Sequence, residues 1–422
     1  MVLAKFFENK FIYHTLIVLA GSTLANFGNY IFHLSMGRLM VPAEYGALTA
    51  LISFFTLLII PTIAFNLIIV KAVTAESAKG NPGNLGGLFN YFLIRFLVLG
   101  LVVFFFLLIF SRQISQFLKI GDSTPVVIIS GLVLTVLLVV VNRAFLQGLL
   151  KFEFFTLSGI LEVVFKIGIA IILVKAGLSV LGAILAILLA DLAIWAITFI
   201  PLKKWLPAKK TASVSLDNLK VNVLPLLIGP LALLSFYSSD VILVKHFFSE
   251  FEAGIYSSLS VIGRVIFFSS AAIGFVMFPV VSQRFSQRKG YGQIFSLSLV
   301  LVGLISGVIL LFYSLWPKFT VSLLFGPAYS QVANFLASFG VFMFLFSLAS
   351  VFVTFYLAIE RWITVWFVIL AAILQIILIS FFHQTIEQVI TVSIISSAIL
   401  LFWLVVYFLK TQLATRSNRI LQ

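Results

Sequence analysis

The chain has 422 residues, of which 62% are hydrophobic and only 9% are charged. So few charged side chains cannot cover a water-soluble protein of this length, which excludes a soluble globular enzyme or binding protein. The net charge of +14 does not indicate a nucleic-acid partner, because the lysines and arginines form no patch and instead separate long apolar runs. We therefore expect a protein embedded in a lipid bilayer.

Twelve apolar segments are each long enough to cross the hydrocarbon core as a helix, which takes about 20 residues. The predicted spans are 11–37, 46–71, 88–111, 125–149, 153–175, 178–201, 219–247, 254–282, 291–316, 329–358, 362–382 and 386–409. The first is too long for a signal peptide, so we expect it to be retained. The predicted fold class is an all-α integral membrane protein with about twelve transmembrane helices.

The two halves of the chain carry matching turns. The stretch YSSDVILVKHFFSEFEAGIYSSLSVIGR, which ends at Arg264, aligns with GRLMVPAEYGALTALISFF after a shift of 208 positions. The shift pairs Glu44 with Glu252, Gly46 with Gly254, Leu48 with Tyr256 and Leu51 with Leu259. An offset near half the chain length indicates an internal duplication, from which many transporters build two lobes. We expect a six-helix lobe at 1–201, a polar cytoplasmic linker at 202–218 and a second six-helix lobe at 219–422.

Basic residues near the ends of the spans predict the orientation. With both termini in the cytoplasm, eighteen of the 27 lysines and arginines lie on the cytoplasmic side, six lie on the other side and three lie within spans. Loops rich in Lys and Arg stay in the cytoplasm. We therefore expect a multi-pass protein of the cytoplasmic membrane with both termini inside.

Charged residues within the spans are the leading candidates for function, because a charge in hydrocarbon is costly and usually faces a bundle interior or a wet cavity. Six residues qualify: Arg95, Glu162, Lys166, Asp191, Asp240 and Arg264. Glu162 and Lys166 lie four residues apart on one helical face, so they form either a self-neutralising pair or part of a cavity. Arg95 either lines a cavity or extends to lipid phosphates.

Asp240 and Arg264 occur in the repeated helix pair, but their counterparts in the first half are Phe32 and Thr56. The duplicated scaffold therefore does not require them, which favours a functional role, although the two residues can also form a structural ion pair. Asp191, in the middle of the sixth span, is either a carboxylate that titrates or a hydrogen-bonded helix contact.

Uncharged polar residues also occur within the spans. Asn26 and Asn29 lie in the first span, and Tyr237 lies in the seventh. Asn29 and Tyr237 are equivalent under the shift of 208 positions, so polar groups lie on corresponding faces of both lobes. They either line a shared path or make hydrogen bonds between helices.

Several kinds of site are absent from the sequence. The chain has no cysteine, so thiolate metal sites and thiol nucleophiles are excluded. Its four histidines are too scattered along the chain for a metal site, and it contains neither a P-loop nor a nucleophile elbow. We expect no catalytic residue, metal or cofactor, apart from possible coupling to H⁺ or Na⁺.

Three stretches resemble the polysaccharide-biosynthesis flippases, the Wzx-like branch of the multidrug/oligosaccharidyl-lipid/polysaccharide (MOP) exporter superfamily, which also contains the MATE transporters. They are GSTLANFGNYIFHLSMGRLMVPAEYGALTAL, NRAFLQGLLKFEFF at 142–155 and SSDVILVKHFFSEFEAGIYSSLSVIGR at 238–264. The resemblance implies two pseudo-symmetric six-helix lobes in a V shape and a cationic cavity for an undecaprenyl-pyrophosphate-linked glycan. It implies Arg38, Arg95, Lys166 and Arg264 as contacts of anionic phosphate or acidic sugar.

The leading hypothesis is a flippase that moves a lipid-linked oligosaccharide across the cytoplasmic membrane by alternating access. Its partners are then the lipid-linked glycan, the bilayer, and the glycan polymerase and glycosyltransferases of the same pathway. The alternative is a small-molecule or drug exporter of the same superfamily, coupled to H⁺ or Na⁺ through Asp240, Asp191 or Glu162. A polytopic glycan polymerase or ligase is a third reading, which the short outer loops disfavour.

Overall fold

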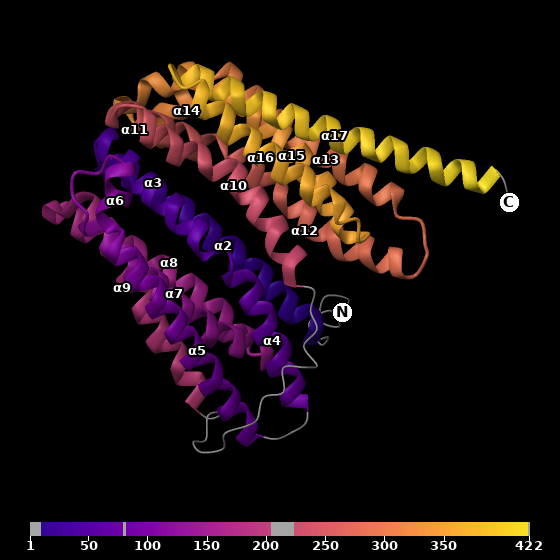
Figure 1. Ribbon diagram of the computed structural model, residues 1–422, viewed down its shortest axis with the longest axis horizontal. Helices are drawn as coiled ribbons and strands as arrows, with labels where there is room; N and C mark the ends of the chain where they lie inside the picture. The colour runs from indigo at the N-terminus through magenta and orange to yellow at the C-terminus, as the bar shows by residue number, and fades with distance from the viewer. Residues whose placement is uncertain (1–9, 79–81, 204–222, 421–422) are drawn as a thin grey trace, which may run out of the picture. The chain divides into compact units, whose positions relative to one another are not determined.

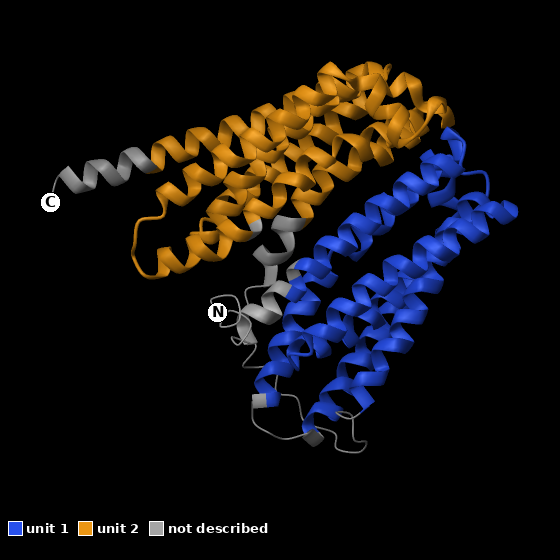
Figure 2. Ribbon diagram, turned by 180° about the vertical axis from the view of Figure 1, so that it is seen from behind, with its two compact units in different colours: residues 1–227 blue, residues 228–422 orange. Residues whose placement is uncertain are grey.

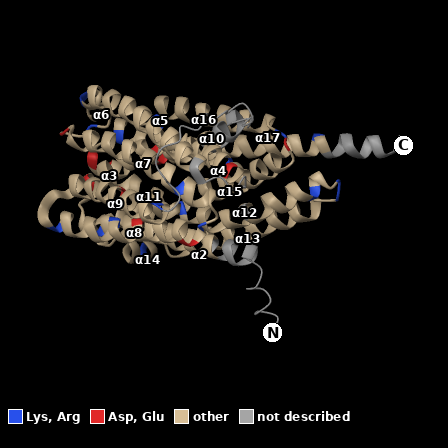
Figure 3. Ribbon diagram, turned by 90° about the horizontal axis from the view of Figure 1, so that it is seen from below, with Lys and Arg blue, Asp and Glu red and all other residues tan. Residues whose placement is uncertain are grey.

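The computed structural model describes residues 10–78, 82–203 and 223–420, and within these ranges every regular element is helical (Figure 1). An apolar chain in a bilayer has no water to bond its backbone, so helices that satisfy their own N–H and C=O groups are the expected result. Figure 3 shows how sparsely Lys, Arg, Asp and Glu occur along these helices.

Nine helices among the described residues are long and apolar enough to cross a membrane. One of them, Phe152–Leu202, contains two successive crossings, and the helices α2 and α10 supply two more, which gives twelve. The predicted all-α membrane fold with about twelve spans is confirmed. The chain is a multi-pass membrane protein.

The chain divides into two compact units, Met1–Leu227 and Ile228–Gln422 (Figure 2). The predicted linker at 202–218 lies almost entirely outside the described residues, as do its basic residues from Lys204 onward. The predicted lobes at 1–201 and 219–422 stay a prediction, and each compact unit is described by itself.

Unit 1 contains eight α-helices and one short π-helical turn among its described residues. These are α2 (Lys10–Leu39), α3 (Pro42–Ile59), α4 (Thr62–Ala78), α5 (Pro82–Ile109), α6 (Ser111–Phe117), α7 (Thr124–Gly148), α8 (Phe152–Leu173), η1 (Val174–Leu178) and α9 (Ser179–Leu202). The helix α8 packs against α2 on one side and α9 on the other.

Unit 2 begins in α10 and repeats this order. Its elements are α10 (Val223–Phe247), α11 (Glu250–Gly263), α12 (Val265–Ser286), α13 (Gly292–Leu315), α14 (Pro317–Leu324), η4 (Pro327–Asn334), α15 (Leu336–Ala358), α16 (Ile363–Phe381) and α17 (Ile386–Ile420). The helix α15 packs against α12, α13 and α17.

The order of helices supports the internal duplication. The ends of α2 at Leu39 and of α10 at Phe247 are 208 positions apart, and so are the starts of α3 at Pro42 and α11 at Glu250. In both units the second span is interrupted, and the third span is followed by a short helix, α6 or α14. The repeat predicted from the matching turns therefore extends over all six spans of each unit.

The interruption of the second span has a different local cause in each unit. In unit 1 it coincides with Pro61, which lacks the backbone N–H that a continuous helix needs. In unit 2 it coincides with Arg264, which ends α11 and begins α12 with a ψ of −14°. Arg264 is therefore located at the joint between two helix segments.

Two glycines allow α2 to lie very close to α8. A Cβ atom added to Gly21 would be 1.8 Å from Cγ2 of Thr156, and one added to Gly28 would be 2.3 Å from Cγ1 of Val163. Small residues permit this kind of approach between membrane helices, where packing replaces the hydrophobic effect. The approach brings Lys166, one turn after Val163 on α8, to the side of α2.

Candidate functional site

Lys166 in α8 is the buried cation of unit 1, with 8% of its surface exposed. Its Nζ donates a hydrogen bond to Oδ1 of Asn29 in α2. The same Nζ lies 4.9 Å from the centre of the Phe32 ring, a distance at which the ring face attracts a cation. Lys166 and Asn29, both predicted site residues, therefore lie in direct contact.

Glu162 makes its ion pair between helices. Its Oε2 lies 2.7 Å from a terminal guanidinium nitrogen of Arg143 in α7, and Nε of Arg143 donates to Oγ of Ser158 at 3.0 Å. Lys166, four residues further along α8, instead directs its ammonium to Asn29. The interhelical pair replaces the predicted self-neutralising pair as the direct contact of Glu162.

Asp191 in α9 completes a cluster of charges in unit 1. Its carboxyl group is buried, with 4% of the residue exposed, and interacts electrostatically with Glu162, Arg143 and Lys166. The four side chains come from three helices and are two bases and two acids. The cluster as a whole is therefore balanced, and Lys166 is its member that reaches α2.

Asp240 in α10 is the central acid of unit 2 and is fully buried. Its Oδ2 accepts a hydrogen bond from the Tyr256 hydroxyl at 2.8 Å, and its Oδ1 accepts one from the Val241 backbone N–H at 2.8 Å. A terminal nitrogen of Arg264 lies 3.6 Å from Oδ1. The predicted alternative of an ion pair between Asp240 and Arg264 is therefore present in the structure.

Arg264 makes further contacts with Tyr237 of α10. Its guanidinium donates a hydrogen bond to the Tyr237 carbonyl and lies 5.1 Å from the centre of the Tyr237 ring. Its Nε is buried without a hydrogen-bond partner among the described residues, and 14% of its side chain is exposed. Arg264 therefore keeps one buried donor unpaired and exposes a small part of its side chain.

The two cations contact equivalent places on the first helix of each unit. Lys166 contacts Asn29 and Phe32, and Arg264 contacts Tyr237 and Asp240, which are the same two positions after the shift of 208. The cations themselves come from different helices of the repeat. The sequence shift alone therefore did not reveal this correspondence.

The other two predicted cations lie elsewhere in unit 1. Arg95 is exposed on α5 and stacks over the Tyr91 ring at 4.1 Å, on the helix side that also exposes Val98 and Val102. An exposed position beside apolar side chains suits an arginine that extends to lipid phosphates. Arg38 is exposed in the last turn of α2. The structure does not bring either residue to Lys166, and their predicted contact with substrate stays a prediction.

A buried polar chain in unit 2 extends beyond the predicted residues. The Oγ of Ser393 in α17 accepts from Nε2 of Gln375 in α16 at 3.0 Å and donates to the Val389 carbonyl at 2.9 Å. The electrostatic interactions of Tyr256 include Ser393. Single Ser and Gln residues in apolar spans are common, so nothing in the sequence distinguishes these two as site residues. Arg143 was missed because its position near the end of a span made it one of the charges used for orientation.

Comparison with known proteins identifies the family. The family model described as polysaccharide biosynthesis protein matches residues 35–334, which is more than half of the chain. The chain belongs to this polysaccharide biosynthesis family. The resemblance read from the sequence is confirmed.

A curated relative and three solved structures resemble this family member. An uncharacterised membrane protein of Methanocaldococcus jannaschii, MJ1375, is 30% identical over 209 residues, and the alignment covers 46% of each chain. The chain thus aligns with less than half of the length of this relative. An inward-facing multidrug resistance MATE family transporter of the MOP superfamily has a TM-score of 0.70 at 14% identity, with 91% of this chain and 94% of that chain covered.

The lipid II flippase MurJ, in an inward closed conformation, also has a TM-score of 0.70 at 14% identity, with 92% of this chain and 87% of that chain covered. A MOP superfamily transporter from Pyrococcus furiosus, whose structure was described as having a binding pocket of reversed polarity, has a TM-score of 0.59 at 16% identity, and 94% of each chain is covered. At these identities the likeness shows a shared fold.

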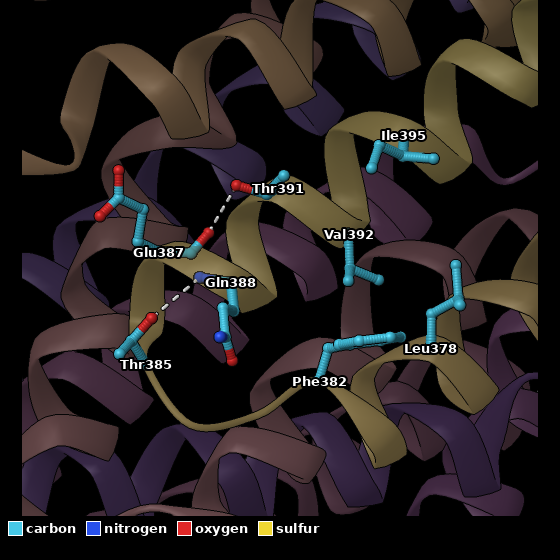
Figure 4. A pocket seen from close by; sticks show the side chains of 8 residues that line it. All are labelled: Leu378, Phe382, Thr385, Glu387, Gln388, Thr391, Val392 and Ile395. Carbon is cyan, nitrogen blue, oxygen red and sulfur yellow. Dashed lines mark hydrogen bonds between the residues drawn. The ribbon is translucent and has the colours of Figure 1, made fainter.

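This member of the polysaccharide biosynthesis family also has a hollow of about 560 Å³ where α16 is followed by α17 (Figure 4). It is lined by Leu378, Phe382, Thr385, Glu387, Gln388, Thr391, Val392 and Ile395. The Thr385 hydroxyl caps α17 by accepting from the Gln388 backbone N–H at 3.2 Å. Glu387 is its one charged lining residue, and none of the predicted site residues line it.

Proposed function

We propose that this protein is a flippase that moves a lipid-linked oligosaccharide with an anionic linkage, such as an undecaprenyl-pyrophosphate glycan, from the cytoplasmic to the outer leaflet by alternating access. Family membership supports a role in polysaccharide biosynthesis. The fold shared with MOP superfamily transporters, among them a flippase, supports transport of the substrate.

The observation that carries the proposal is the pair of cations, Lys166 and Arg264, at equivalent places on α2 and α10. A charge within a membrane span is costly and is retained where it serves a substrate or an ion. Lys166 contacts an aromatic ring and a neutral oxygen, whereas Arg264 contacts an aromatic ring, a carbonyl oxygen and the Asp240 carboxylate. We propose that the N–H groups beyond these contacts serve a phosphate. An anionic pyrophosphate is the part of a lipid-linked glycan that such groups recognise.

Transport in proteoliposomes tests the proposal. The purified protein is reconstituted with a fluorescent polyprenyl-pyrophosphate oligosaccharide, and the rate at which the label crosses the bilayer is measured. We expect Lys166→Gln, and the double variant Asp240→Asn with Arg264→Gln, each to slow transport about 10- to 100-fold, because a charge-assisted hydrogen bond contributes roughly 1.5–3 kcal/mol. The double variant removes the guanidinium without leaving Asp240 unpaired.

The matched control is Lys289→Gln, which removes one positive charge from an exposed loop residue between α12 and α13. It should transport at the wild-type rate. Wild-type rates in both site variants would show that the two cations do not serve the substrate, and the proposal would then be wrong.

The second candidate is an exporter coupled to H⁺ or Na⁺. It is favoured by Asp191 and Asp240, two buried carboxylates at membrane depth, with Glu162 as a third predicted coupling residue. Each is already close to a cation of the chain, so a coupling ion would compete with Lys166, Arg143 or Arg264. The same proteoliposomes separate the candidates, since an imposed Na⁺ or proton gradient accelerates transport only in a coupled carrier.

An enzymatic role as a glycan polymerase or ligase has the least support. The described residues offer no clustered catalytic set on an exposed loop, and the similar solved structures are of transporters and a flippase. We also propose that the protein resides in the cytoplasmic membrane with both termini in the cytoplasm, on the distribution of its basic residues.

A further inference from the structure

The surface of α2 is divided into faces of different chemistry. At about 100° per residue, one arc of the helix carries only polar side chains between positions 22 and 33. This polar face of α2 consists of Ser22, Asn26, Asn29, Tyr30 and His33. Ser22 and Asn26 are exposed, and the other three are half-buried. The arc therefore reaches the surface of unit 1.

Two other faces of α2 account for its contacts with protein and lipid. Gly21, Gly28 and Phe32 are buried on the side that packs against α8. Leu24, Phe27 and Ile31 form a separate apolar face, with 58%, 61% and 36% of their surface exposed. The apolar face suits contact with acyl chains. An asparagine amide in contact with acyl chains would lose its hydrogen bonds to water, which costs several kcal/mol in a fully apolar solvent.

The polar face of α2 is therefore expected to border a path that holds water or a polar substrate. Its free capacity for hydrogen bonds lies at Ser22, Asn26 and Tyr30, whose side chains have no hydrogen-bond partner within the described part of the chain. His33 and Asn29 are already engaged, His33 with the Tyr45 hydroxyl at 3.3 Å and Asn29 with Lys166.

The duplicated scaffold does not require this face. Shifted by 208 positions, Ser22 corresponds to Pro230, Asn26 to Leu234 and His33 to Val241. Unit 2 thus builds the same helix with apolar residues at these three places, of which Val241 is buried, whereas Asn29 and Tyr30 correspond to the polar residues Tyr237 and Ser238. Polar groups that only one of two repeats carries, here Ser22, Asn26 and His33, are evidence for a specific task of that repeat.

The charge of the face limits what it can recognise. It carries hydroxyl, amide, phenol and imidazole groups, which both donate and accept hydrogen bonds, and it carries no carboxylate. The ammonium of Lys166 lies beside it, at Asn29. This combination complements a neutral polyhydroxylated group joined to an anion, and it offers no negative charge to a cationic compound.

We propose that the polar face of α2 binds the uncharged sugar units of the lipid-linked head group, while Lys166 holds the anionic linkage. The proposal rests on the proposed flippase function and adds the part of the substrate that unit 1 recognises. From Ser22 to His33 the face extends about 16 Å at 1.5 Å per residue, a length that accommodates more than one sugar ring.

Binding to two lipids tests the inference. Full-length protein in nanodiscs is titrated with a polyprenyl pyrophosphate that carries a neutral disaccharide, and with the same polyprenyl pyrophosphate without sugar. The wild type should bind the glycosylated lipid more tightly. Asn26→Leu should weaken binding of the glycosylated lipid by about five- to thirtyfold, the effect of one or two lost hydrogen bonds, and leave the bare lipid unchanged.

Two comparisons make this result specific. Phe27→Leu, on the adjacent apolar face, should leave both affinities unchanged, and Asn26→Ser should retain part of the preference for sugar. Equal binding of the two lipids by the wild type, or equal weakening of both by Asn26→Leu, would overturn the inference. Lys166→Gln should weaken the binding of both lipids by the same factor. If Lys166→Gln has no effect on binding while Asn26→Leu removes the preference for the glycosylated lipid, the inference about the polar face holds and the anion contact of the proposed function is wrong.

A second measurement avoids the risk that Asn26→Leu disturbs folding. The chain contains no cysteine, so Asn26→Cys introduces a single thiol. Its reaction with a membrane-impermeant maleimide should be slowed at least fivefold by the glycosylated lipid and much less by the bare lipid. A thiol that does not react in the absence of lipid, or that both lipids protect equally, would contradict the inference.

Discussion

At the scale of single residues, the ion pair of unit 2 is unequal in its burial. Asp240 is completely buried, whereas 14% of the Arg264 side chain is exposed. An unpaired charge costs more the further it is from water, and breaking a buried pair costs about 3–5 kcal/mol. The two members of the pair should therefore respond differently to removal of the partner.

We predict that Arg264→Leu lowers the free energy of unfolding by about 3–5 kcal/mol, because it leaves the buried Asp240 carboxylate without a cation. Asp240→Asn should cost less, about 1–3 kcal/mol, because Arg264 keeps the Tyr237 carbonyl and partial contact with solvent. The measurement is thermal unfolding of each purified variant in the same detergent.

The double variant of Asp240→Asn with Arg264→Leu serves as the control for this pair. It should be more stable than Arg264→Leu alone, because no uncompensated carboxylate remains. Additive losses in the double variant would mean that the 3.6 Å approach of the two groups has no energetic consequence.

At the scale of helices, the close approach of α2 and α8 places Lys166 against Asn29. Gly21 and Gly28 on α2 face side-chain atoms of α8, so a larger residue at either position must separate the helices or force a side chain to move. Overpacking of this kind typically costs about 1–3 kcal/mol. The approach is thus a requirement of the site as well as of the fold.

We predict that Gly28→Ala destabilises the protein by about 1–3 kcal/mol, because the new methyl group would lie 2.3 Å from Cγ1 of Val163. Adding Val163→Ala should restore most of the loss by removing the opposing atom. Gly168→Ala in α8 is the matched control, since nothing lies within 4 Å of its added Cβ, and it should be neutral or slightly stabilising. Equal losses for both glycines in thermal unfolding would contradict the packing argument.

The sequence predicted the helices well, because the length of an apolar run and the positions of turns are local properties. It offered the ion pair between Asp240 and Arg264 as one alternative, but it did not predict the contacts of Glu162 and Lys166. The spacing of Glu162 and Lys166 shows only that they share a helical face, and the rotation of α8 toward α2 and α7 decides that one contacts Arg143 and the other Asn29. The close packing of α8 on Gly21 and Gly28 brings the two helices together along this face.

At the scale of the whole molecule, the order of helices in the two units supports the internal duplication that the sequence indicates. Four matched residues around one turn indicated an offset of 208, and the same offset relates the ends of α2 and α10. The differences between the two repeats point to the candidate functional residues, which their shared helix order does not. The cations come from different helices, and three of the five residues of the polar face of α2, Ser22, Asn26 and His33, have apolar counterparts on α10.

We predict that loops separated by an odd number of spans lie on opposite sides of the membrane. Gln287 follows the eighth predicted span and Gln384 follows the eleventh, and both residues lie at exposed or half-exposed ends of helices. Single cysteines at these positions, in a chain that has none of its own, should react from the cytoplasmic side at Gln287 and from the outside at Gln384. Reaction of both from one side would refute the twelve-span topology.

The interruption between α11 and α12 has a consequence for motion. The residue at this joint, Arg264, is also the one whose guanidinium compensates Asp240 on α10. A change in the angle between α11 and α12 would therefore carry the guanidinium toward or away from the carboxylate. A ligand that draws the arginine away from Asp240 would therefore favour a different angle at this joint.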